Sequence, residues 1–196
     1  MSSALAVASV TAVLKNLLED RLVSVGLSAP LGDPEVSALP PDRVETGAEE
    51  RSRLNLFLYR VAPNSGWRPA AQNGTVTPAA LALDLYYLLT AYGGQDFVAE
   101  ILLGEAMQTL LETRVLGADA IRRALAVVAP NGHAGIVSGG RAVLSKSTLA
   151  DQVEQISISP EFMSTEELSR MWSALQASYR PSVAYKVSAA LIRANG

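Results

Sequence analysis

Apolar side chains are densest in two stretches near the middle of the chain, residues 53–61 and 81–92. In the first stretch, Leu54, Leu56 and Leu58 alternate with residues that are also mostly apolar or aromatic. Successive side chains of a strand point to opposite faces, so both faces of each stretch are apolar. Neither stretch is long enough to cross a membrane as a helix. The pattern therefore predicts two central strands that are covered on both faces.

The residues before these strands predict a helix and then a loop. Either Ser2 or Ser3 can cap the helix, because a serine hydroxyl can accept a hydrogen bond from the first turn. The apolar positions at helical spacing are Val7, Val10, Leu14, Leu17 and Leu18. Four prolines between residues 26 and 48 then predict an extended or looped crossing.

The residues after the strands predict more helices mixed with strands. Asp96 is expected to cap a helix, and a shorter helix is expected from about Asp119. The side chains expected to face inward are Phe97, Ile101, Ala106, Leu110 and Leu111 in the first helix, and Ile121, Leu125 and Val128 in the second. Residues 153–159 are predicted to form a strand that Pro160 stops.

The clearest helix start is the capping box from Ser164 to Glu167, followed by Trp172 on the apolar side. In residues 183–191 apolar side chains then alternate with more polar ones, which predicts a strand with one more polar face. Helices and strands intermix without a strict βαβ repeat. The sequence thus predicts an α+β single domain with a mixed or antiparallel central sheet flanked by helices.

Composition narrows the class of protein. The chain is 49% hydrophobic and 18% charged, which leaves apolar surface to cover, for example in an oligomer. A net charge of −3 and a pI near 5.2 argue against binding to nucleic acid or to a membrane surface. The absence of cysteine fits a cytoplasmic protein, and no apolar run is long enough for a membrane span.

Few residues offer catalytic chemistry. His133 is the only histidine and follows an Asn-Gly turn, so no metal site and no catalytic base is predicted. Lys146 is preceded by Ser145, where a phosphate-binding P-loop requires glycine. Asp84 lies within an apolar strand and is expected to pair with Arg60 or Arg53, since a buried charge needs a partner. Glu50 is interpreted as part of a solvated approach to the first strand.

Several short motifs occur in an order that is specific in combination. They are residues 55–60, 67–69, 83–92, 102–104, 172–175 and 180–182, followed by Tyr185. In this order the chain resembles the N-terminal domain of the cap, or tail-terminator, proteins of extracellular contractile injection systems, which are phage-tail-like particles. It departs from the family in having Glu100-Ile101 where many members place a histidine, and in ending at Gly196 where many continue.

The resemblance implies a tail-terminator-like domain over residues 1–196, with no C-terminal extension. It implies a structural protein without a cofactor, which forms a homo-hexameric ring, closes the end of the inner tube and contacts the last sheath layer. Trp67 and Arg68, in the long loop of residues 63–78, are the interface candidates, because Trp and Arg are enriched in interface hot spots. Two alternatives stay open: a baseplate or tube-adaptor component of the same particle, and a small phosphate-binding enzyme that uses the Lys146 loop.

Overall fold

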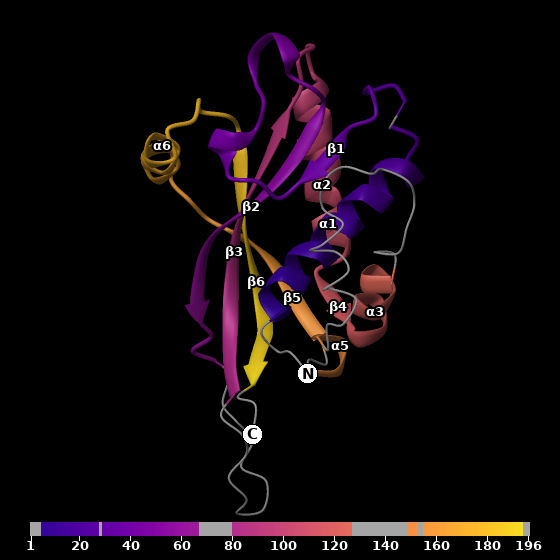
Figure 1. Cartoon of the computed structure of the whole chain (residues 1–196), viewed down its shortest axis with the longest axis vertical. Coiled ribbons are helices and arrows are strands. Elements are labelled where there is room, and N and C mark those ends of the chain that lie inside the picture. Colours follow the sequence, from indigo (N-terminus) through magenta and orange to yellow (C-terminus); the bar gives the residue numbers. More distant parts are fainter. Residues whose placement is uncertain (1–4, 28, 67–79, 127–148, 153–154, 194–196) are drawn as a thin grey trace, which may run out of the picture.

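A six-stranded mixed sheet with helices on both sides forms the molecule (Figure 1). The computed structural model describes residues 5–27, 29–66, 80–126, 149–152 and 155–193. The strands are β1 (Glu35–Ser37), β2 (Arg53–Pro63), β3 (Ala80–Tyr92), β4 (Val115–Gly117), β5 (Gln155–Glu161) and β6 (Ser182–Arg193). The helices are α1 (Ala6–Ser24), α2 (Val98–Glu112), α3 (Ala118–Ala126), α5 (Leu149–Gln152) and α6 (Thr165–Ala174), with short 3₁₀ turns η2 (Pro41–Arg43) and η3 (Gly47–Glu49).

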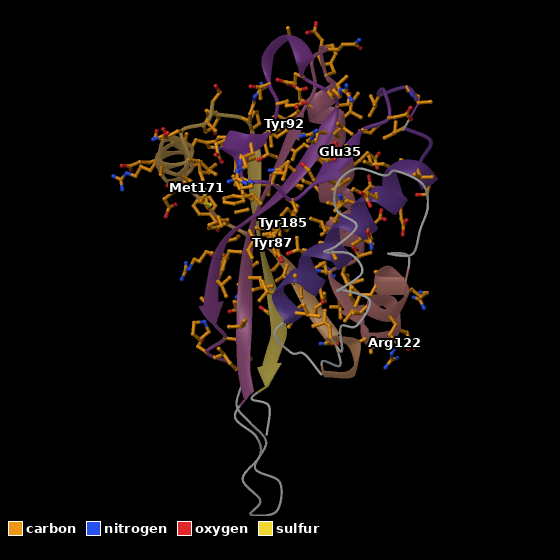
Figure 2. All side chains as sticks on the ribbon, viewed as in Figure 1. Glu35, Tyr87, Tyr92, Arg122, Met171 and Tyr185 are labelled. Carbon is orange, nitrogen blue, oxygen red and sulfur yellow. The ribbon has the colours of Figure 1, made fainter. Side chains whose placement is uncertain are left out.

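The strand order is β1-β2-β3-β6-β5-β4, and only the β1–β2 pair is parallel. β3 pairs with β2 along one edge and with β6 along the other, so it is the central strand that the sequence predicts. Tyr87 of β3 pairs with Tyr185 of β6 in the middle of the sheet (Figure 2). The predicted α+β fold with a mixed sheet is confirmed.

β2 is central along only part of its length. β1 pairs with it from Arg53 to Asn55, and beyond Asn55 no described residue makes a backbone hydrogen bond to its outer edge. The second half of the strand becomes progressively exposed, and Arg60, Val61 and Pro63 face solvent. The prediction that this strand is covered on both faces is therefore correct for its first half and wrong for its second.

One face of the sheet holds the main core. α1, α2 and α3 lie on this side, where aliphatic side chains of β2, β3, β5 and β6 meet them (Figure 1). The Thr11 hydroxyl of α1 is hydrogen-bonded to the Tyr87 hydroxyl at 2.8 Å, which attaches the helix to the central strand. Asn16 of the same helix donates to the carbonyl oxygen of Ala124 in α3 at 2.6 Å. Polar contacts therefore fix α1 between the sheet and α3.

α6 covers part of the opposite face (Figure 1). The predicted capping box is present: the Glu167 N–H donates to Ser164 Oγ at 3.2 Å, and the Ser164 N–H donates to Glu167 Oε2 at 2.8 Å. The hydrogen bond from the Ser164 backbone is the main cause of a lowered pKa of the Glu167 carboxyl. Trp172 is buried and its ring packs against Tyr179, which ties the helix to the connection that leads into β6.

The rotation of α2 differs from the prediction. Phe97, and not Asp96, is the residue that precedes the first helical turn, and it adopts φ +67°. The buried side chains of α2 are Val98, Leu102, Ala106, Thr109 and Leu110, whereas Phe97, Ile101 and Leu111 are exposed. The close approach of Gly93 to Val98 fixes this rotation, because a Cβ atom at position 93 would lie 2.6 Å from Val98 Cγ1. Ala106 and Leu110 face inward as predicted.

The other sequence predictions are met with smaller differences. Ile121 of α3 is buried and Leu125 packs against the core, while Val128 lies outside the described residues, as do Ser2 and Ser3. The segment 26–48 contains β1, the 3₁₀ turn η2 and the start of η3, which the proline pattern does not reveal.

Pro160 lies inside β5 and does not stop it. Ile158 donates its N–H to the carbonyl oxygen of Arg114 on the β4 side, and β4 pairs no further than Ser157. Residues two apart in a strand face the same edge, so the nitrogen of Pro160 faces an edge where no described strand pairs with β5. A proline is tolerated there because the missing N–H breaks no ladder hydrogen bond.

Candidate interaction surface

Asp84 of β3 is a buried carboxylate that is held by polar contacts with two neighbouring side chains. Asn64 Nδ2 donates to Asp84 Oδ1 at 2.7 Å, and Lys186 Nζ of β6 lies 4.0 Å from Oδ2. The predicted partners Arg60 and Arg53 are wrong, since the bulge between Leu58 and Arg60 places the Arg60 guanidinium over the Tyr86 ring at 4.7 Å. Arg53 instead pairs with Glu35 of β1 at 2.9 Å.

Glu50 is the most tightly held charge among the described side chains, contrary to its interpretation as a solvated residue. Its carboxylate is only 5% exposed and accepts hydrogen bonds from Arg180 Nη1 at 3.2 Å and Nη2 at 2.5 Å. The Gly93 N–H donates to the same carboxylate at 3.0 Å. The Arg180 guanidinium also lies 5.5 Å from the centre of the Tyr92 ring. The cluster joins three segments that are distant in sequence.

Burial raises the pKa of Tyr92 to about 12, and the nearby Arg180 charge only partly opposes this effect. Burial likewise raises the pKa of Tyr87, despite its hydrogen bond to Thr11. Both tyrosines therefore stay neutral at physiological pH. Their place in the core gives them a packing role, not an acid–base role.

An apolar stripe runs along the outer face of α2. Phe97 is 72% exposed and Leu111 61%, and Ile101 and Met107 are also exposed. Gly104 lies in the middle of the stripe, where a Cβ atom would meet no other atom within 4 Å. We refer to Phe97, Ile101, Gly104, Met107 and Leu111 as the α2 stripe. Isolated exposed apolar residues are common, but several on one helix face mark an interaction surface.

A second apolar feature lies in the connection from β5 to α6. Phe162 in this connection is 90% exposed, and Tyr179, just after α6, is also exposed. The sequence interpretation missed both Phe162 and the outward face of α2. The available signal was that α2 carries more large apolar residues than one buried face can hold.

The interface candidates Trp67 and Arg68 directly follow Gly66 but lie outside the described residues. His133 and Lys146 also lie outside them. Over the part of the chain that the structure covers, no group of three or more His, Cys, Asp or Glu side chains is placed to hold a metal ion. None of the helices in that part combines the length and the hydropathy needed to cross a membrane.

Comparisons with known proteins identify the family. A family model described as the Pvc16 N-terminal domain matches residues 9–196, and the chain belongs to this family. The fold is similar to the sheath/tube terminator, in its extended state, of the extracellular contractile injection system PVC (TM-score 0.50, 17% identity, 89% of this chain and 56% of that chain). It is also similar to the tube-terminating cap of the anti-feeding prophage (TM-score 0.50, 16% identity, 82% of this chain and 49% of that chain).

The chain spans about half the length of these two solved structures. No curated protein matches it by sequence. The resemblance stated from the short motifs is thus confirmed at the level of family and of fold.

Proposed function

We propose that this chain is the structural cap domain of a phage-tail-like contractile injection system. It closes the end of the inner tube and contacts the last layer of the sheath. The observation that carries this proposal is the family match over residues 9–196, together with the terminator-like fold. The role is mechanical, because stopping a growing tube requires a surface of fixed shape and no chemical step.

The proposal includes a hexameric ring that assembles with the particle in the cytoplasm. The high apolar content and the exposed side chains of the α2 stripe support self-association. Trp67 and Arg68 are proposed as contacts to tube or sheath, on the strength of their residue types and their place after a strand that is braced by the sheet.

The test is a capping assay with purified tube protein and this chain. We expect the protein to appear at one end of each tube in negative-stain micrographs and to halt further growth. The control is heat-denatured protein, which should neither bind tube ends nor halt tube growth. Protein that binds along the tube wall, or that leaves tube growth unchanged, would refute the proposal. Binding only at the end where growth begins would indicate a baseplate or adaptor role instead.

A further inference from the structure

The α2 stripe and the connection from β5 to α6, which carries Phe162, lie on opposite sides of the sheet. α2 packs with α1 and α3 on one side, whereas the connection that carries Phe162 leads into α6 on the other (Figure 1). Figure 2 likewise shows Met171 of α6 and Arg122 of α3 on opposite sides of the sheet. The two apolar features of one molecule therefore cannot cover each other.

This arrangement is what a head-to-tail contact between identical subunits requires. In a ring, every contact is heterologous: one patch of a subunit meets a different patch of its neighbour. A contact of α2 with α2 would be isologous instead, and it would close a pair and leave Phe162 exposed. Two unlike apolar patches on opposite sides favour a head-to-tail contact over an isologous pair.

One of the two patches projects from the surface, and the other has a gap. Phe162 is a single large ring that projects almost completely into solvent. The α2 stripe has a gap at Gly104, with Ile101 and Leu111 exposed on the same helix face. A missing side chain in the middle of an apolar helix face lets a partner approach the backbone closely, as a buried anchor residue in an interface requires.

The backbone at the start of the stripe is strained. Phe97 has a φ of +67°, a value that bulky residues rarely adopt, yet its side chain gains no burial in the subunit from this conformation. Backbone strain that brings a side chain no burial within its own subunit is frequent at sites that bind a ligand or a partner.

We propose that Phe162 of one copy packs against the α2 stripe of the next copy, near Gly104, and that this contact closes the ring. The inference rests on the ring of the proposed function and names the surfaces that form it. Glu100 and Gln108, which are exposed beside the stripe, form the polar rim of the contact.

Two variants each remove one side of the contact. Gly104→Gln places a side chain at the gap, where a Cβ atom would meet no other atom within 4 Å, and Phe162→Asp removes the projecting ring. Val23→Asp is the matched control, because Val23 is as exposed as Phe97 but lies at the end of α1. Mass photometry over a concentration series measures the association of the full chain, alone and with tube ends.

We expect each of the two variants to associate at least about tenfold more weakly than the wild type, as loss of an interface anchor does. The Val23→Asp control should assemble normally. An equal mixture of the two variants should form heterodimers and nothing larger, because only one intact pair of patches then exists. This outcome is specific to a head-to-tail contact. Should Gly104→Gln fail to fold, Ile101→Asp takes its place.

Three results would overturn the inference. They are a wild type that stays monomeric both alone and on tube ends, rings that both variants form as readily as the wild type, and a mixture of the variants that gives no heterodimer. The capping assay separates these results from a failure of the proposed function. Variants that still form rings but no longer cap tubes would show that the α2 stripe binds the tube or the sheath, which leaves the cap role standing.

Discussion

Arg180 binds Glu50 through both terminal nitrogens of its guanidinium, although 130 residues separate the two in sequence. The pair connects the segment before β2 to the segment that leads into β6. Because Gly93 at the end of β3 donates to the same carboxylate, the three longest strands of the sheet share one polar anchor at this end. The anchor fixes the strands relative to one another, and so it also positions α2, which follows β3, and α6, which precedes β6.

The Arg180–Glu50 pair should be essential for stability. Arg180→Ala leaves the Glu50 carboxylate buried without its cation, and we expect a loss of about 3 kcal/mol in the free energy of unfolding. Urea denaturation followed by circular dichroism measures this loss. Arg170→Ala is the matched control, since Arg170 pairs with Glu166 on the exposed face of α6 and should contribute about 0.5 kcal/mol or less. Equal effects of the two changes would contradict the assignment.

Stability should fall at alkaline pH because of the buried tyrosines. The pKa of Tyr92 is raised from 10.0 to about 12, so the folded state retains a proton that the unfolded chain releases. The contribution is fully present below pH 10 and is lost as the pH rises toward 12. Denaturation midpoints measured across this range should decrease.

Tyr92→Phe provides the comparison for this pH effect. The Tyr92 hydroxyl is buried and has no hydrogen-bond partner among the described residues. We therefore expect Tyr92→Phe to be neutral, or more stable by up to about 1 kcal/mol at pH 7, and to lose less stability at high pH. A large destabilisation at pH 7 would show that the hydroxyl has a partner after all.

Two glycines should respond to alanine with opposite signs. Gly93→Ala places a Cβ atom 2.6 Å from Val98 Cγ1, and we expect a destabilisation of about 1–3 kcal/mol as the start of α2 is displaced. Gly104→Ala meets no atom within 4 Å and removes a glycine from a helix interior, so we expect a gain of about 0.5–1 kcal/mol. Thermal denaturation of both variants gives the test, and a loss of stability in Gly104→Ala would contradict the position of α2.

The Trp67→Ala, Arg68→Ala double variant tests the interface candidates. We predict that its thermal stability stays within about 1 kcal/mol of the wild type, as surface changes usually do. The same variant should attach less well to tube or sheath and give uncapped or length-variable particles in micrographs. A large loss of stability would instead mean that Trp67 covers the sheet, and the interface proposal for this loop would then fail.

Patterns over short stretches of sequence determined much of the fold. The two-sided apolar stretches marked β2 and β3, and the capping box at Ser164 marked α6, because alternation and capping depend only on neighbouring residues. The order of several short motifs was sufficient for the family, which the match over residues 9–196 confirms. Pro160 misled the strand prediction, since whether a strand edge is paired is not a local property.

The tertiary structure alone decided which of two apolar faces α2 buries. Phe97 and Ile101 are as apolar as Val98 and Leu102, so the helical period fits either choice, and the contact of Gly93 with Val98 selects one. The tertiary structure also decides which residues pair with the buried charges. Glu50 meets Arg180, and Asp84 meets Lys186, only after β3 and β6 are side by side, because electrostatic pairing depends on distance in space and not along the chain. Asp84 meets Asn64 through the pairing of β2 with β3.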